Sequence, residues 1–120
     1  MSEKEKYLEE NGVNFEQALS YLGDMETFDE ILKDFYDGMD AQMNEIEKYK
    51  NLNDMNNYAI LVHALKSNCR SLGIIPFADI AYQHELAGKE NNVSYVEQNY
   101  NELVAMKEKY KQIISNYLNS

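Results

Sequence analysis

His63, Lys66 and Arg70 are the residues whose types and spacing most favour chemistry in this 120-residue sequence. They follow one another at steps of three and four residues, the spacing that places side chains on one face of a helix. A helix turns by about 100° per residue, so Lys66 and Arg70 lie within about 60° of His63. A neutral histidine ring is a nucleophile near pH 7. Its attack on an acyl phosphate would form phosphohistidine, an anionic product that lysine and arginine stabilise.

Small residues lie one turn to either side of His63, with Ala59 before it and Ser67 after it. We expect both on the exposed face of the helix. The opposite, core face is predicted to centre on Leu61, Leu65 and Leu72, with Tyr58, Val62 and Cys69 flanking them. Small side chains there would let the active site of another protein reach the ring. Spacing alone leaves a second interpretation open, in which His63 is an exposed surface residue with unrelated basic neighbours.

The helix that must carry these residues is predicted over about 54–72, and Gly73 is a typical residue just after a helix end. Apolar residues at steps of three and four, with polar caps and breakers between them, predict further helices over 15–22, about 25–50, 76–88 and 93–118. The first ten residues are expected to form a short amphipathic helix or a frayed extension. No segment has the pattern of a strand. The sequence therefore predicts one all-α domain over 1–120, an antiparallel four-helix bundle with an additional short N-terminal helix or helices.

Charge and composition exclude several classes of function. The sequence has 21 acidic against 11 basic residues and a formal net charge of −10, which argues against nucleic acid and anionic membranes as partners. Cys69 is the only cysteine, so no internal disulfide forms, and a reducing cytoplasm is expected. The N-terminus lacks the apolar core of a signal peptide, and no run of apolar residues is long enough to span a membrane. We expect a cytoplasmic monomer without a cofactor of its own.

Two stretches of the sequence resemble the histidine-containing phosphotransfer domain family. Residues 63–73 read HALKSNCRSLG, similar to the family's His-x-Leu-Lys-Gly/Ser motif followed by Leu-Gly. Residues 12–35 read GVNFEQALSYLGDMETFDEILKDF, similar to the family's amino-terminal half, which often has Ala-Leu, a glycine and then a Phe-rich helix. The two stretches occur in the family's order, and the resemblance covers about residues 12–89.

The resemblance implies a four-helix bundle with an exposed phosphoacceptor histidine, which by position is His63. Lys66 then stabilises the phosphoryl group, Ser67 is the small residue where a receiver domain approaches, and Gly73 ends the helix. Arg70 is a candidate phosphate or partner contact from its helix face, and is not a strict family feature. The implied partners are response-regulator receiver domains, a sensor histidine kinase, or both. Any Mg²⁺ would belong to the receiver, and no P-loop or kinase glycine loop is present in the sequence.

The following helix departs from the family's common Leu-Glu pair, because His84 and Glu85 stand there. His84 falls on an apolar stripe with Phe77 and Ile80, so we expect a half-buried, hydrogen-bonded core histidine. Gln83 and Glu85 could both lie near His63 across the helix pair, and the sequence does not decide which of them hydrogen-bonds its Nδ1 atom.

Three alternative functions stay open at this point. The first is a helical module that docks a signalling partner without being phosphorylated. The second is a metal-binding bundle that uses the two histidines, although the Glu-x-x-His pairs of such bundles are missing. The third is the phosphoacceptor domain of a larger histidine kinase, including the chemotaxis type, in which ATP is the phosphoryl source.

Overall fold

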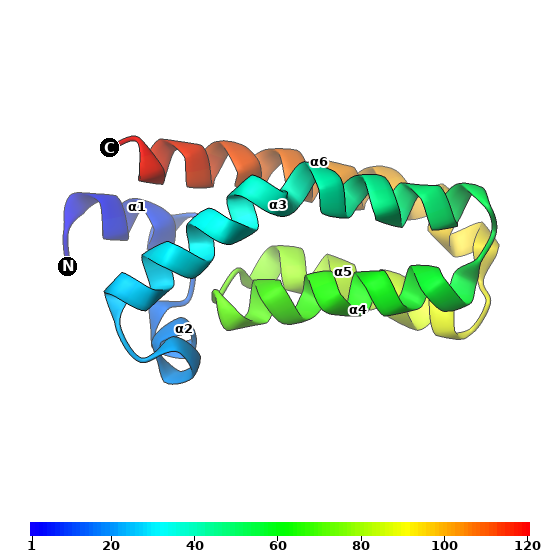
Figure 1. Cartoon of the computed structure of the whole chain (residues 1–120), viewed down its shortest axis with the longest axis horizontal. Helices are drawn as coiled ribbons and strands as arrows, with labels where there is room; N and C mark the ends of the chain where they lie inside the picture. Colours follow the sequence, from blue (N-terminus) through cyan, green and yellow to red (C-terminus); the bar gives the residue numbers. More distant parts are fainter.

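A computed structural model describes all 120 residues of the chain as six helices (Figure 1). Four long helices lie side by side, and two short ones cover one end of them. In chain order the helices are α1 (Glu3–Glu10), α2 (Phe15–Leu22), α3 (Met25–Asn51), α4 (Met55–Ser71), α5 (Ile75–Lys89) and α6 (Val93–Leu118). The only strand-like feature is an isolated bridge between Val13 and Ile74.

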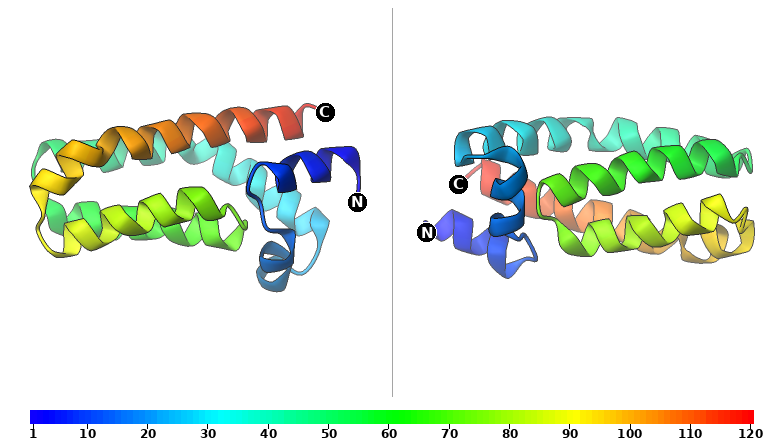
Figure 2. Two further views of the ribbon diagram at one scale, coloured as in Figure 1. Left: turned by 180° about the vertical axis from the view of Figure 1, so that it is seen from behind. Right: turned by 90° about the horizontal axis from the view of Figure 1, so that it is seen from below.

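Helices α3 to α6 form an antiparallel bundle because only three residues connect each one to the next, at 52–54, 72–74 and 90–92. The middle residue of each connection has a positive φ: 54° at Asn53, 70° at Gly73 and 55° at Asn91. Glycine and asparagine adopt this conformation most readily, so each turn carries a residue suited to it. Figure 2 gives two further views of the four helices, in which successive helices run in opposite directions.

Most helices begin at a side chain that accepts a hydrogen bond from the first turn. These caps are Ser2, Asn14, Asp24, Asp54 and Asn92. Ser2 and Glu5 also form a reciprocal capping box, so residues 3–10 are helical rather than a frayed extension. Helix α5 has no side-chain cap and instead carries Pro76 in its first turn. The local sequence thus determines where each helix starts.

The short N-terminal helices fix the turn that follows α4. The Asn14 N–H donates to the Gly73 carbonyl oxygen at 2.8 Å, and a Cβ atom at Gly73 would overlap the Asn14 carbonyl group. Gly73 is therefore required twice, for its positive φ and for this close approach. Helix α1 packs on α6, and α2 packs on α3 and α4, so the bundle end next to this turn is covered.

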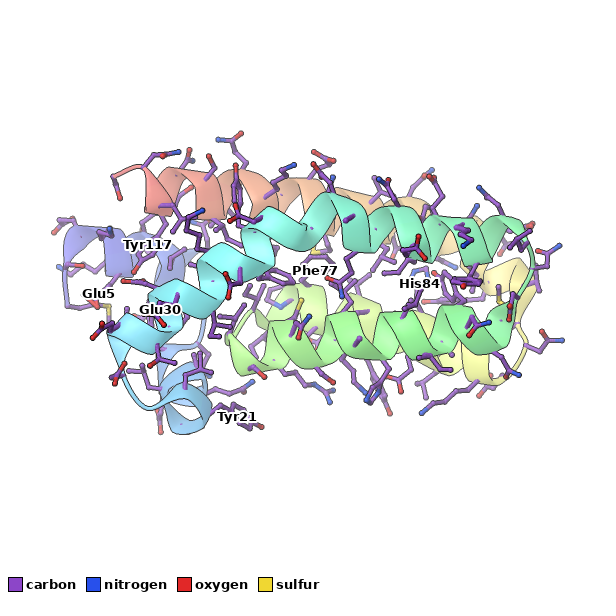
Figure 3. All side chains as sticks on the ribbon, viewed as in Figure 1. Glu5, Tyr21, Glu30, Phe77, His84 and Tyr117 are labelled. Atoms are coloured by element: carbon purple, nitrogen blue, oxygen red, sulfur yellow. The ribbon has the colours of Figure 1, made fainter.

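The core runs along the bundle axis and is rich in aromatic side chains. Phe77 and His84 lie inside the bundle, whereas Tyr21 projects outward from α2 (Figure 3). The hydroxyl groups of the buried Tyr110 and Tyr117 donate to the Asn11 carbonyl and to the Asp29 carboxylate, at 2.8 and 2.6 Å. Each buried phenol thereby has a hydrogen-bond partner.

The predicted bundle is confirmed, but two predicted core positions are wrong in detail. The spacing of apolar residues in α3 predicts that Ile31 is buried, but it is 39% exposed because it lies at the groove between α3 and α2. On α4 the buried face centres on Tyr58, Val62 and Cys69, while Leu61 is only half-buried. The core face of α4 is therefore rotated from the predicted one. No helix in the chain has both the length and the apolar character that membrane crossing requires.

Candidate functional site

His63 lies midway along α4 with its side chain 56% exposed. Its Nδ1 atom is 2.9 Å from Oε2 of Glu85 on α5. Of the two candidate partners from the sequence, Glu85 is therefore the one that the structure brings to His63. Gln83 is exposed on the same helix and makes no hydrogen bond to His63.

This hydrogen bond determines which nitrogen of His63 is free. A carboxylate only accepts hydrogen bonds, so the proton of the neutral ring must be on Nδ1. Nε2 then carries the lone pair and is the nucleophilic atom. The exposed part of the ring is available to a group brought by another protein.

Glu85 is the buried centre of the site, with only 1% of its side chain exposed. Lys66 Nζ lies 2.5 Å from Oε1 and forms an ion pair with it. Oε1 has no other partner. Lys89 Nζ lies 2.8 Å from Oε2, the oxygen that also accepts from His63. Burial raises the pKa of Glu85, but the ammonium groups of Lys66 and Lys89 and the His63 ring outweigh it and lower the pKa to about 2. Glu85 is therefore ionised at neutral pH.

Lys66 does not lie on the exposed stripe where the helical wheel places it. Only 9% of its side chain is exposed, because α4 turns this position toward α5. The ammonium group sits between Oε1 of Glu85 and the ring of Tyr82, whose centroid is 5.0 Å away. A buried lysine needs such a counter-ion, and Lys66 therefore contacts Glu85 directly.

Ala59 also differs from the expectation that it leaves room for a partner. It is 6% exposed and packs against Gly88, where a Cβ atom would lie 3.0 Å from that of Ala59. These two small residues let α4 and α5 approach closely one turn from His63. The approach allows His63 and Glu85 to meet.

The remaining predicted site residues lie on the exposed surface. Ser67 is exposed one turn after His63. Arg70 is exposed and stacks on the Tyr82 ring, 5.4 Å from its centroid. Two turns, about 10 Å, separate Arg70 from His63 along the helix, so Arg70 is better placed for a partner surface than for a group on His63.

Sequence reasoning missed Lys89 and Tyr82. Lys89 stands four residues after Glu85, the spacing of an ion pair within a helix, and this signal was available in the sequence. Tyr82 stands three residues before Glu85 and packs against both Lys66 and Arg70. Its role depends on the contact between α4 and α5, which the sequence alone does not specify.

A shallow hollow of about 400 Å³ opens beside His63. Its walls come from α4 and α5 and consist of Asn56, Ala59, Ile60, His63, Glu85 and Lys89. No acidic residue occurs between Asp54 and Asp79, so α4 is free of carboxylates in a chain of net charge −10. The charged side chains of α4 are the basic residues Lys66 and Arg70.

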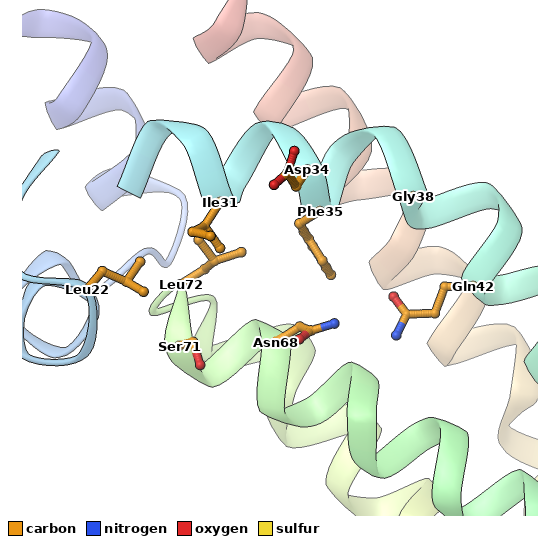
Figure 4. Close-up of a pocket in the computed structure, with 9 residues that line it drawn as sticks. All are labelled: Leu22, Ile31, Asp34, Phe35, Gly38, Gln42, Asn68, Ser71 and Leu72. Atoms are coloured by element: carbon orange, nitrogen blue, oxygen red, sulfur yellow. The ribbon is translucent and has the colours of Figure 1, made fainter. Parts of the chain in front are cut away.

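A second groove, of about 470 Å³, lies between α2, α3 and α4 and does not include His63 (Figure 4). Leu22, Ile31 and Leu72 form its apolar part, and Asn68 and Ser71 lie on its α4 side. It has no titratable group other than Asp34. The groove therefore holds neither a histidine nor a basic side chain.

His84, adjacent to Glu85 in sequence, belongs to the core and is completely buried rather than half-buried. Its Nε2 atom lies 3.1 Å from the Asn99 carbonyl oxygen, which can only accept, so Nε2 carries the proton. Nδ1 then accepts from the Tyr58 hydroxyl at 2.8 Å. Burial lowers the pKa of His84, against the raising effects of the Asn99 hydrogen bond and the Glu102 charge. Both nitrogens are used within the fold.

We expect this buried histidine to make the protein less stable as pH falls from 7 to 5. The unfolded chain protonates His84 at a pKa of about 6.5, while the folded state resists protonation. The unfolded state therefore binds more protons below about pH 6.5, and the free energy of unfolding falls by at most about 1.4 kcal/mol per pH unit. Urea titrations at several pH values measure this slope.

The comparison that isolates His84 uses two variants. His84→Leu should flatten the slope between pH 7 and 5, even though it leaves the Tyr58 hydroxyl without a partner. His63→Gln should keep the slope attributed to His84. An unchanged slope in His84→Leu would show that His84 is not its source.

Groups of three or more His, Cys, Asp or Glu side chains that could hold a metal ion do not occur in the structure. The two histidines lie in different environments, since His63 is exposed on α4 and His84 is buried within the bundle. They also bond to different residues, His63 to Glu85 and His84 to Tyr58 and Asn99.

The site is thus an exposed histidine on a bundle helix whose Nδ1 atom bonds to a buried carboxylate. The family model for the Hpt domain matches residues 30–115. The chain belongs to the Hpt, or histidine-containing phosphotransfer, domain family, whose members work in two-component signalling. Comparisons with curated proteins and with solved structures find no match.

Proposed function

We propose that this chain carries a phosphoryl group on Nε2 of His63, taking it from a receiver-domain phosphoaspartate or a histidine kinase and passing it to the aspartate of another receiver. The observation that supports this most directly is the 2.9 Å hydrogen bond from His63 Nδ1 to the ionised Glu85. It leaves the exposed nitrogen with a lone pair. The chain is then a covalent carrier and co-substrate rather than an autonomous enzyme.

In the transfer step, the Nε2 lone pair attacks phosphorus, and the bond between phosphorus and the aspartate oxygen breaks. The aspartate leaves as a carboxylate, and no proton has to move. The ring keeps its Nδ1 proton and becomes positively charged. Glu85 faces that proton and stabilises the new charge, as a buried carboxylate does for an imidazolium.

Lys66 supports this role by holding Glu85 in place. Its ammonium group neutralises the buried carboxylate from the side opposite His63 and keeps Oε2 directed at the ring. Lys66 at Oε1, His63 at Oε2 and the close packing of the helices leave the Glu85 side chain little freedom to move. Catalytic positioning needs this preorganisation.

The exposed face of α4 is the surface that we assign to the receiver domain. Ile60 is 63% exposed, and Ala64 and Ser67 continue the same face beyond His63. An apolar and small-residue surface around a reactive ring lets a partner's active site close over it. Arg70 and Tyr82 flank this face and are placed to contact the partner's rim. The Mg²⁺ of the reaction belongs to the receiver, and a cytoplasmic location stays a prediction.

Phosphotransfer profiling tests the function. The protein is mixed with each receiver domain and kinase of the source genome after these have been labelled with ³²P. We expect acid-labile, alkali-stable label on this chain within seconds to minutes from one or a few donors. Stable binding to a receiver with no transfer of label would instead support a non-phosphorylated docking module. Labelling by a kinase alone would indicate that the chain works as a kinase's phosphoacceptor domain.

A further inference from the structure

Lys89 is the exposed cation of the site. Its Nζ atom is 2.8 Å from Oε2 of Glu85, and the same oxygen accepts the Nδ1 proton of His63 at 2.9 Å. Because they share one oxygen, the ammonium group and the imidazole ring are neighbours. The Lys89 side chain is 61% exposed and lines the hollow beside His63, whereas Lys66 is 9% exposed and does not line it.

The charges at the site are unbalanced before phosphorylation. One carboxylate, Glu85, faces the two ammonium groups of Lys66 and Lys89, which leaves a single surplus positive charge. A phosphoryl group brings a charge of about −2, and its attachment makes the ring positive. Phosphorylation therefore brings the net charge of the site close to zero. The surplus ammonium group can pair with the phosphoryl group only if it can reach it.

Only one of the two lysines is free to do so. Lys66 is buried against Tyr82, and its departure would leave Oε1 of Glu85 without a partner. Oε2, by contrast, keeps the His63 Nδ1 proton when Lys89 leaves. A lysine side chain has a long, flexible stem, so an exposed one moves a few ångströms at little cost.

We infer that Lys89, and not Lys66, binds the phosphoryl oxygens on His63, exchanging Glu85 for the phosphoryl group when His63 is phosphorylated. This inference rests on the proposed function of His63. It differs from the family resemblance, which implies that Lys66 stabilises the phosphoryl group. Lys66 is a positioning residue that holds Glu85, and Lys89 is the phosphate-binding residue.

The test uses phosphoramidate as a small-molecule donor, so that no partner protein is needed. Nε2 of His63 attacks phosphorus, the nitrogen–phosphorus bond of phosphoramidate breaks, and ammonia leaves. In the phosphorylated protein, the ¹⁵N signal of the Lys89 ammonium group should shift and that of Lys66 should stay. In Lys89→Ala the ³¹P titration midpoint of phospho-His63 should rise by roughly half a pH unit or more, because a cation favours the dianion.

Two further variants separate phosphate binding from a general charge effect. Lys33 pairs with Asp37 at 2.8 Å within α3 and is 63% exposed, closely matching the Lys89–Glu85 pair, so Lys33→Ala should leave the ³¹P midpoint unchanged. Lys89→Arg should restore it. A midpoint that is equal in Lys89→Ala and the unmodified protein, or a shift of the Lys66 signal with Lys89 unmoved, would overturn the inference.

The same experiments distinguish failure of the inference from failure of the function. Chemical phosphorylation needs only an accessible His63 ring, so the behaviour of Lys89 is measured whatever the natural donor is. If phospho-His63 responds to Lys89 but no receiver or kinase exchanges label with the chain, the proposed relay function is wrong and the local inference holds. If label passes normally and the Lys89 variants behave like the unmodified protein, only the inference is wrong.

Discussion

The variant His63→Gln is expected to accept no phosphoryl group from any donor that labels the unmodified protein. Glutamine has no nucleophilic ring nitrogen, and the only other histidine is completely buried with both nitrogens hydrogen-bonded. No second acceptor is therefore available on the chain. Gel autoradiography after mixing with a ³²P-labelled receiver measures the loss, which should be complete within detection.

The fold of His63→Gln should be unaffected, because the replaced side chain is 56% exposed and takes no part in the core. Circular dichroism and urea unfolding check this, with a change in unfolding free energy within about 0.5 kcal/mol expected. His84→Leu is the matched control, since it removes the other histidine and should still be labelled. Undiminished labelling of His63→Gln would refute the assignment of His63 as the phosphoacceptor.

The second large effect is expected from Glu85→Gln, which should slow phosphoryl acceptance by roughly tenfold to a hundredfold, or about 1.4–2.7 kcal/mol in the barrier. The amide keeps the shape of the side chain but not its charge. It no longer requires the His63 proton to be on Nδ1, and it does not stabilise the positive ring that forms on transfer. Rapid-quench mixing with a phosphorylated receiver measures the rate.

Stability has to be separated from catalysis in this variant, because Glu85→Gln leaves the buried Lys66 without its counter-ion. Breaking a buried ion pair from one side costs about 3–5 kcal/mol. The double variant Lys66→Met with Glu85→Gln removes the uncompensated charge, so it should recover stability without recovering the rate. Glu90→Gln, an exposed change at the residue that follows α5, is the matched control. A normal rate in the stabilised double variant would show that Glu85 has only a structural role.

The pH dependence of stability offers an independent check on Glu85. Its pKa is lowered to about 2 in the folded protein, while an unfolded glutamate titrates near 4.3. The unfolded state then binds more protons between these values, so the contribution of Glu85 is fully present above about pH 4.3 and is lost as pH falls toward 2. This window lies below that of His84, and the two effects can be measured separately.

Helix boundaries were the most predictable feature of this chain, because their determinants are local. Asn14 and Asp24 cap helices at the predicted positions, and the predicted bounds of the last helix, 93–118, agree with α6. The antiparallel arrangement follows from three-residue connections whose middle residues include Gly73. These signals lie within a few residues of one another, and the sequence displays them directly.

The candidate phosphoacceptor and the family were also predictable from the sequence. His63 stands in a motif with a small residue one turn later, and the order of the two similar stretches pointed to the Hpt family. A helical wheel placed His63 on an exposed face, and it is exposed. The wheel was wrong for Lys66 and Ala59, because a wheel describes one helix and does not say where the neighbouring helix packs.

The sequence by itself determined the class of fold, the helix ends and the histidine that we propose as the phosphoacceptor. Only the tertiary structure decided how that histidine is oriented and which cation is free. Both depend on the close contact of α4 with α5 at Ala59 and Gly88. This contact brings Glu85 to His63 and buries Lys66 at the interface of the two helices. Burial and ion pairing are properties of two surfaces in contact, so no periodicity within a single helix specifies them. The same contact leaves Lys89 exposed. Instead of the basic stripe expected from the sequence, the site has the Glu85 carboxylate at its centre.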